Sequence, residues 1–301
     1  MSGFEDRLRS AAGASRVKSA EPMSLHTSFR IGGPAEWFVE AGSEEAVVRV
    51  LALCREEEVP CHVIGNGSNL LVSDAGVPGV VLCLGNAFSD IAFEGETVTA
   101  QTGILLSRLA RMAAQKGLAG LAFAAGIPGT LGGGLYMNAG AYGGELVQVV
   151  TGARLLFPDG TVRDAEAPEL ALGYRRSSLM DSGAVALSVT LKLREGDEAA
   201  IFAEMDDLAA RRRDKQPLEY PSAGSTFKRP AGHYAGQLIE AAGLKGARVG
   251  GACVSEKHAG FVINDGGATA ADVLALCELV QEKVYASSGI HLEREIRFLG
   301  A

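Results

Sequence analysis

The spacing of apolar residues predicts helices in several parts of the chain. In residues 43–58, apolar side chains recur three and four positions apart, Ser43 stands where an N-cap belongs, and acidic residues fill the first turn. A similar pattern over residues 105–117 predicts a helix that Gly117 ends. Further helices are expected at residues 4–12, 197–215, 234–243 and 269–289.

The segments between these helices predict strands. Residues 184–195 predict one long strand, residues 292–300 a strand with alternating faces, and residues 146–165 a hairpin that turns at Pro158-Asp159-Gly160. Helices and strands are mixed without a regular βα repeat, so the sequence predicts an α+β fold rather than a doubly wound sheet. Further strands are expected at residues 36–40, on both sides of the glycines in 61–74, and within 79–85, 91–103 and 260–264.

The composition is that of an ordinary globular chain and argues against several functional classes. Of 301 residues, 47% are hydrophobic and 21% are charged, which suits two or three domains. The net charge of −8, with Arg211–Arg213 as the main basic run, argues against nucleic-acid binding. The sequence has neither a run of about 18 apolar residues nor the apolar core of a signal peptide, so we expect a cytoplasmic protein with no membrane insertion. Five cysteines without a CxxC motif indicate reduced thiols, and five scattered histidines predict no metal site.

Two glycine-rich segments carry the first candidate chemistry. Residues 126–145 contain eight glycines in twenty positions, together with apolar residues that can pack, so this segment is not a flexible linker. Packed glycine-rich backbone allows successive N–H groups to form a concave site for phosphate. Residues 64–70 form a second glycine loop, and neither segment has the Walker A or the dinucleotide-binding pattern. One such loop alone is more often a tight turn, but the pair favours a cofactor diphosphate.

Motifs along most of the chain resemble those of a known family. Residues 64–74 (IGNGSNLLVSD) and 124–145 (AAGIPGTLGGGLYMNAGAYGGE) resemble the paired diphosphate loops of the FAD-binding domain found in vanillyl-alcohol oxidase and p-cresol methylhydroxylase. From about residue 20 onward, the chain resembles more specifically the UDP-N-acetylenolpyruvoylglucosamine reductase family. The motifs that carry this more specific resemblance are TSFRIGGPA (27–35), GYRRSSL (173–179), GSTFKRP (224–230) and LEREIRFLG (292–300).

The resemblance implies a flavoenzyme with a two-part FAD-binding domain and a smaller α+β substrate-binding domain. The implied parts are residues 1–84 joined by strand 291–301, residues 85–196, and residues 197–290. FAD is expected to bind non-covalently, and NADPH is expected to be the co-substrate. The implied FAD contacts are Gly65, Asn66, Gly67, Ser68, Asn69 and Leu70 in the first loop, and Gly126, Ile127, Pro128, Gly129, Thr130, Gly133, Asn138 and Ala141 in the second.

Reduction of an enol ether requires a hydride and a proton at neighbouring carbons, and the resemblance assigns the proton to Ser225. Gly224 beside it allows the backbone to bring the Ser225 hydroxyl close to a substrate. Serine is a weak acid, so its neighbours must stabilise the alkoxide that remains. Ser222 is the competing serine in the same segment.

Two charged residues complete the implied catalytic set. Arg175 can hold the substrate carboxylate through a bidentate guanidinium, whereas the adjacent Arg176 is expected to be a surface charge. Glu295 is the implied glutamate. Glu293 would share its face of a regular strand, so it stays open as an alternative or a partner.

The substrate implied by the resemblance is enolpyruvyl-UDP-N-acetylglucosamine, with UDP-N-acetylmuramate as product in peptidoglycan precursor synthesis. Lys215, Lys228, Arg229 and His258 are the expected substrate contacts, and Tyr220 and Tyr234 stay open between substrate and structural roles. We therefore expect a monomeric UDP-N-acetylmuramate dehydrogenase. Only 50 residues separate Arg175 from Ser225, which resembles the shorter, second-type form of the family.

The rival hypotheses are an oxidase of the same FAD superfamily, acting on a sugar lactone or hydroxy acid, and a nucleotide-sugar-binding module without redox chemistry.

Overall fold

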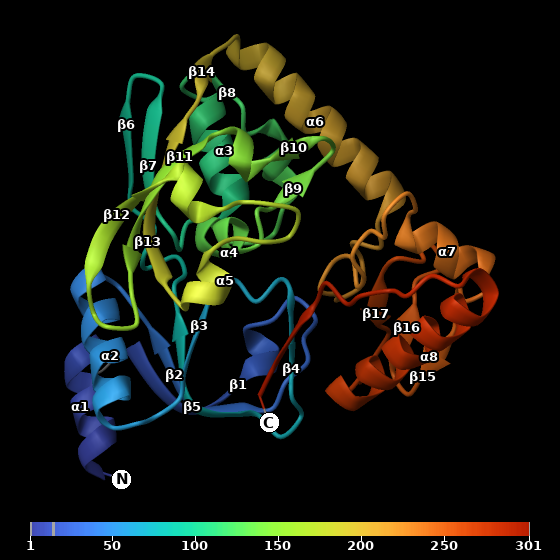
Figure 1. Ribbon diagram of the computed structural model, residues 1–301, viewed down its shortest axis with the longest axis horizontal. Coiled ribbons are helices and arrows are strands. Elements are labelled where there is room, and N and C mark those ends of the chain that lie inside the picture. The colour runs from blue at the N-terminus through green and yellow to red at the C-terminus, as the bar shows by residue number, and fades with distance from the viewer. Residues whose placement is uncertain (1, 14–15, 301) are drawn as a thin grey trace. The chain divides into compact units, whose positions relative to one another are not determined.

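The computed structural model describes residues 2–13 and 16–300 and divides into two compact units (Figure 1). The first unit comprises residues 1–19, 37–66 and 79–211, and the second comprises residues 20–36, 67–78 and 212–301. Met1 and Ala301, which belong to predicted domain segments, lie outside the described residues. The first glycine loop, residues 64–70, passes from one unit to the other between Asn66 and Gly67. The division into three domains stays a prediction.

The N-terminal part of the chain forms a four-stranded sheet and two helices. The sheet has the order β1-β2-β5-β3, in which β3 (Cys61–Ile64) is parallel to β5 (Val77–Cys83). Ser43 caps the predicted helix, because its Oγ accepts a 3.2 Å hydrogen bond from Ala46 N. The remaining elements are α1 (Ser2–Ala12), α2 (Glu44–Glu56), β1 (Val17–Pro22) and β2 (Pro34–Glu40).

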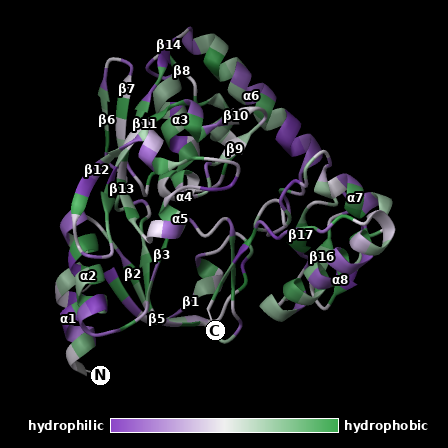
Figure 2. Ribbon diagram, in the orientation of Figure 1, coloured by the Kyte–Doolittle hydropathy of each residue, from purple (hydrophilic) through white to green (hydrophobic). Residues whose placement is uncertain are grey.

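A five-stranded antiparallel sheet forms the rest of the first unit. Its order is β12-β11-β13-β7-β6, and its inner face packs with α3 (Leu106–Ala114) into one hydrophobic core. The predicted hairpin is confirmed: Phe157 N donates to Thr161 O at 2.8 Å, and Gly160 has a φ of +91°. In Figure 2, hydrophilic and hydrophobic residues alternate along α6 (Glu198–Lys215), which buries Ile201 and Met205. The strands are β6 (Ile91–Glu94), β7 (Thr97–Gln101), β11 (Val150–Leu156), β12 (Val162–Glu166) and β13 (Val185–Lys192).

The second unit is built around α8 (Ala270–Ser288). Thr269 and Asp272 form a capping box at its start, and Gly289 ends it with a φ of +70°. Asp74 adds two hydrogen bonds at the same end, from Ala270 N at 2.8 Å and Ala271 N at 3.0 Å. The other elements are η2 (Met23–Leu25), α7 (Ala235–Ala241), the sheet β15 (Arg248–Val249), β16 (Ala252–Val254) and β17 (Val262–Asn264), and the parallel pair β4 (Leu70–Val72) and β18 (Arg297–Leu299).

The mixture of helices and antiparallel and parallel strands confirms the α+β prediction. Among residues 2–13 and 16–300, no helix has both the length and the apolar composition needed to cross a membrane. Short elements fill the remaining connections: β8 (Leu118–Ala119), η3 (Ala122–Gly126), β9 (Gly140–Ala141), β10 (Gly144–Glu145), η4 (Leu146–Gln148), η5 (Ala167–Leu170), α5 (Leu179–Ser182) and β14 (Arg194–Glu195).

One local prediction was wrong, and one helix was not predicted. The predicted strand 292–300 is regular only over β18, because the chain bends at Ile296. The glycine-rich segment 126–145 contains a helix, α4 (Leu131–Tyr136), which its three glycines disfavour. The glycines are needed for packing: a Cβ at Gly132 would lie 2.9 Å from Thr102 Cβ, and one at Gly134 would lie 3.0 Å from Leu106 Cδ1.

Candidate functional site

The first glycine loop presents a row of backbone donors. Gly67 has a φ of +60°, and a Cβ there would overlap the His26 carbonyl, so only glycine fits. Within the described ranges of the chain, the N–H groups of the four residues from Asn66 to Asn69 donate to no protein acceptor. Successive unpaired N–H groups in a turn are suited to bind an anion such as a diphosphate.

The two glycine segments contact each other. Gly65 lies against the Thr130 side chain so closely that a Cβ would overlap Thr130 Oγ1. Asn66 Nδ2 donates to Pro128 O at 2.7 Å. The N–H groups of Gly129 and Thr130 also have no protein acceptor among the residues described. Within the first unit, Gly65 and Asn66 thus pack closely on the start of the second segment, and each loop offers backbone donors of the kind that a cofactor diphosphate requires. The residues of each loop therefore fit FAD.

Arg175 lies in a two-residue turn after the second glycine segment. Gly173 and Arg176 close the turn through two backbone hydrogen bonds of 3.0 and 3.2 Å. Arg175 itself has a φ of +54°, which is rare for a residue with a side chain, and its guanidinium carbon lies 5.3 Å from the centroid of the Tyr174 ring. Arg176 is exposed and forms a 2.7 Å ion pair with Asp181, which agrees with the surface role expected for it.

Ser225 is exposed, and the residue after it, Thr226, is held by two hydrogen bonds to Gly260 and Val262. Gly224 has a φ of +76°, and within the described part of the chain the Ser225 hydroxyl has no protein hydrogen-bond partner. Thr226 is buried: its N–H donates to Gly260 O at 2.8 Å, and its Oγ1 accepts from Val262 N at 2.9 Å. This fixed neighbour holds the Ser225 backbone in place while its hydroxyl stays accessible.

The segment that carries Glu295 pairs directly with the Ser225 segment. Glu295 N donates to Thr226 O at 2.8 Å, and Lys228 N donates to Glu293 O at 2.8 Å. Asn69 of the first glycine loop contacts the same segment, since its Nδ2 donates to Glu295 O at 3.2 Å. The second unit thus brings together the end of the first loop, the Ser225 turn and the Glu295 segment. Arg175 belongs to the first unit, so its membership of this set stays a prediction.

Two of the predicted substrate cations already have partners. Lys228 forms an ion pair with Glu293, whose side chain is 73% exposed, so Glu293 acts here as a partner of Lys228. The guanidinium of Arg229 lies 3.7 Å from the centroid of the Tyr234 ring. Lys215 is exposed in the last turn of α6.

Gly260 connects His258 to the Ser225 turn, because it forms hydrogen bonds with both segments. Gly260 accepts from Thr226 N, and its own N–H donates to His258 Nδ1 at 3.0 Å. This bond assigns the ring proton of neutral His258 to Nε2. Burial lowers the pKa of His258, so the ring is neutral near pH 7. A neutral Nε2–H group can donate a hydrogen bond to a substrate oxygen.

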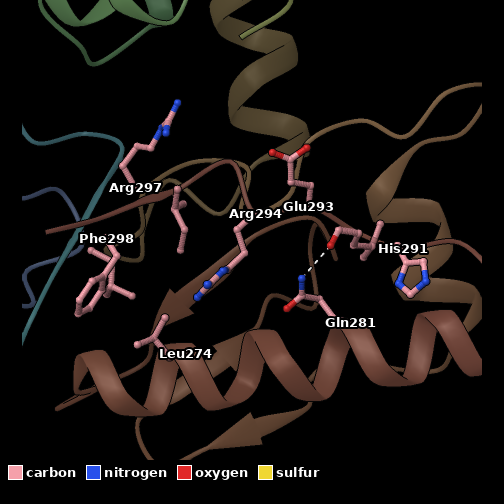
Figure 3. A pocket seen from close by; sticks show the side chains of 10 residues that line it. Leu274, Gln281, His291, Glu293, Arg294, Arg297 and Phe298 are labelled. Atoms are coloured by element: carbon pink, nitrogen blue, oxygen red, sulfur yellow. Dashed lines mark hydrogen bonds between the residues drawn. The ribbon is translucent and has the colours of Figure 1, made fainter. Parts of the chain in front are cut away.

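A separate cavity of about 700 Å³ lies between α8 and the C-terminal segment (Figure 3). Arg294 extends toward α8, whereas Glu293 and Arg297 point away from that helix. Gln281 closes one part of the cavity by donating to Leu292 O at 2.7 Å. The cationic side chains do not converge, so the cavity is not an evident anion site.

Sequence reasoning missed several residues that build the site. Thr226, Ser177 and Asp74 lie within the quoted motifs, but the sequence does not reveal their buried or helix-capping hydrogen bonds, which join backbone groups far away in the chain. Asn138 was predicted as a cofactor contact, but its side chain is buried and its amide nitrogen donates to Glu145 Oε2 and Gly173 O, both at 3.1 Å. Since both hydrogens of the Asn138 amide group already have acceptors in the protein, a hydrogen bond donated to the cofactor at this position would have to come from the backbone.

The comparisons with known proteins agree along the chain. A family model described as FAD binding domain matches residues 35–166, and one described as UDP-N-acetylenolpyruvoylglucosamine reductase, C-terminal domain, matches residues 216–299. A UDP-N-acetylenolpyruvoylglucosamine reductase of Clostridium perfringens (strain SM101 / Type A) is 50% identical over 279 residues, which cover 93% of this chain and 91% of the relative. One from Symbiobacterium thermophilum, named reductase 2, is 48% identical over 301 residues, 100% of this chain and 98% of the relative.

Solved structures give the same picture. The crystal structure of UDP-N-acetylenolpyruvylglucosamine reductase from Thermus caldophilus matches with a TM-score of 0.82 and 37% identity, covering 94% of this chain and 99% of that chain. An alkyldihydroxyacetonephosphate synthase matches with a TM-score of 0.51 and 16% identity over 65% of this chain and 40% of its own. This second likeness concerns the fold alone.

Proposed function

The chain belongs to the UDP-N-acetylenolpyruvoylglucosamine reductase family, and from that premise we propose that it reduces enolpyruvyl-UDP-N-acetylglucosamine to UDP-N-acetylmuramate. The reaction serves peptidoglycan precursor synthesis and uses non-covalently bound FAD. The observation that carries the proposal is the hydrogen-bonded contact of three segments: the end of the first glycine loop, the Ser225 turn and the Glu295 segment. We further propose NADPH as reductant, a monomer in the cytoplasm, and the three-part domain division.

The cofactor's residues are proposed from the paired loops. The N–H groups from Asn66 to Asn69, with those of Gly129 and Thr130, are available to the diphosphate. When bound, FAD supplies the hydride that the methylene carbon of the enolpyruvyl group requires.

The protein's own residues supply the proton and hold the substrate. Ser225 is proposed to donate its hydroxyl proton to the carbon that bears the ether oxygen, since its hydroxyl is exposed at the site. Hydride and proton together convert the carbon–carbon double bond to a single bond, which leaves a lactyl ether. Glu295, next to the Ser225 segment, is proposed to return a proton to the serine alkoxide.

The arginine and lysine side chains of the site are proposed to bind the negatively charged groups of the substrate. Arg175 would bind the enolpyruvyl carboxylate, because a guanidinium matches a carboxylate in two hydrogen bonds. Lys215, Lys228 and Arg229 would bind the diphosphate, with the Lys228–Glu293 pair opening or rearranging as the phosphate arrives. His258 would donate from Nε2 to a neutral oxygen of the substrate.

Anaerobic stopped-flow absorbance tests the proposal. NADPH should bleach the flavin band, and enolpyruvyl-UDP-N-acetylglucosamine should then restore it. Ser225→Ala should keep the bleaching rate and slow the restoration by about 10²- to 10⁴-fold, the usual contribution of a positioned acid, whereas Ser222→Ala should behave like the unmodified protein. Near-normal restoration in Ser225→Ala would reject the serine as acid. Bleaching by a lactone or hydroxy acid instead would favour the oxidase, and a protein that binds no FAD would favour the binding module.

A further inference from the structure

Two buried side chains tie the turn that carries Arg175 to the end of α4. Asn138 Nδ2 donates to Gly173 O at 3.1 Å, on one side of the turn. Ser177 Oγ donates to Tyr136 O at 2.8 Å, on the other side. Asn138 is 1% exposed and Ser177 is fully buried, so water does not compete for either bond. The turn is thus attached at both ends to the glycine segment whose start contacts Gly65.

We propose that Ser177 and Asn138 are positioning residues, which set the direction of Arg175 toward the substrate carboxylate. The inference rests on the proposed function. Arg175 holds a φ of +54°, and such a conformation in a non-glycine residue persists only where the surroundings enforce it. The backbone bonds between Gly173 and Arg176 close the turn. Ser178 N attaches its C-terminal side to Leu170 O at 2.8 Å, and the bonds from Ser177 and Asn138 attach the turn to the glycine segment.

Asn138 extends the attachment into the second glycine segment. Its Oδ1 accepts from Val147 N at 2.9 Å, while its Nδ2 also donates to Glu145 Oε2 at 3.1 Å. The backbone of Asn138 has a φ of +41°, so this residue too is held in the left-handed region. The Arg175 turn, the end of α4 and the 140–145 hairpin therefore behave as one body. A cofactor held by this segment and a carboxylate held by Arg175 would keep a fixed separation.

Positioning and purely structural roles predict different behaviour of Ser177→Ala. A positioning role leaves FAD content and the rate of NADPH reduction unchanged, because the loop contacts of Gly65 and Asn66 are intact. It raises KM for the enolpyruvyl substrate and slows flavin reoxidation by about tenfold, the effect expected from one lost buried hydrogen bond. Arg176→Gln, in the same turn and exposed, is the matched control and should retain both half-reactions.

A double-mutant cycle identifies the residue through which Ser177 acts. If Ser177 works through Arg175, adding Ser177→Ala to Arg175→Lys should slow reoxidation no further. Hydrogen exchange gives a readout without turnover: the amides of Gly173 and Arg176 should exchange faster in Ser177→Ala and in Asn138→Asp, while amides of β13 keep their protection.

Several results would overturn the inference. Additive losses in the cycle, or loss of FAD together with activity in Ser177→Ala, would mean that the serine is only structural. Unchanged exchange at Gly173 and Arg176 would mean that the turn needs no attachment. Failure of the proposed function looks different, because the unmodified protein would then fail to reoxidise with the enolpyruvyl substrate, whereas the exchange measurement would still report on the turn.

Discussion

Asn69 and Glu295 lie 226 residues apart in the chain and are joined by a 3.2 Å hydrogen bond from Asn69 Nδ2 to Glu295 O. A second bond, from Arg297 N to Asn69 O at 2.9 Å, holds the segment on the other side of Glu295. Asn69 is thus both the end of the proposed cofactor loop and the anchor of the proposed acid–base residue. Moving Asn69 would break both of these bonds to the Glu295 segment.

Replacing Asn69 should therefore affect chemistry more than cofactor binding. Asn69→Ala removes one side-chain hydrogen bond, which is worth about 1 kcal/mol and corresponds to about a fivefold loss where it acts on the rate. We expect reoxidation by the enolpyruvyl substrate to slow by about fivefold, with a smaller change in FAD affinity. Asn66→Ala is the matched control, since it breaks the bond to Pro128 O and should chiefly weaken FAD binding. Identical kinetic profiles for the two variants would contradict this division.

A methyl group at Gly65 should separate the two glycine loops. In Gly65→Ala the new Cβ overlaps Thr130 Oγ1, and Thr130 cannot move easily because it is β-branched, buried and caps α4. We expect a loss of about 1–3 kcal/mol in stability, typical of overpacking, and weaker FAD binding measured by flavin fluorescence. Gly85→Ala is the control, because its Cβ would meet only Cys83 Sγ at 3.4 Å. Tight FAD binding by Gly65→Ala would show that the loop contact is dispensable.

Asp74 should stabilise the second unit through the start of α8. Both of its carboxylate oxygens accept from helix N–H groups, so Asp74→Ala loses a cap and a favourable interaction with the helix dipole. We expect a cost of about 1–2 kcal/mol, measured by chemical unfolding, with FAD binding retained. The exposed Asp206 on α6 provides a comparison, and Asp206→Ala should change stability little. Equal effects of the two substitutions would argue against the cap.

Stability should fall as pH is lowered through the histidine range. Burial lowers the pKa of His258, so the unfolded chain binds a proton at a pH where folded His258 does not, and the free energy of unfolding rises with pH in that interval. The contribution is complete above the ordinary histidine pKa and is lost as pH falls toward the lowered value. His258→Gln should flatten the slope measured between about pH 7 and 5, leaving the part due to His62, whose pKa burial also lowers. The exposed His233 is the control, and an unchanged slope in His258→Gln would refute the prediction.

Local patterns predicted the regular elements well. Ser43 and Thr269 start helices where the sequence indicates, and the Pro158–Gly160 turn forms the predicted hairpin. Helix α4 was not predicted because its glycines disfavour a helix, and only contacts with Thr102 and Leu106, far away in sequence, make them suitable. Propensity cannot report such contacts.

Some residues of the candidate site could likewise be proposed from the sequence, and others could not. Ser225, Glu295 and Arg175 could be named because short motifs surround them. Thr226 and Ser177 could not, because each acts through a hydrogen bond to a backbone group that is 36 or 41 residues away. A hydroxyl in the sequence does not reveal which carbonyl or N–H group it will meet.

The late position of Glu295 in the chain has a consequence for biosynthesis. Both bonds of Asn69 to the segment around Glu295, and the parallel partner of β4, come from residues 295–299. While a ribosome is still making the chain, the first glycine loop already exists but its partner does not. The contacts of Asn69 and β4 with residues 295–299 can form only after β18 has been synthesised. A nascent chain therefore lacks the complete Glu295 environment until synthesis has passed this strand.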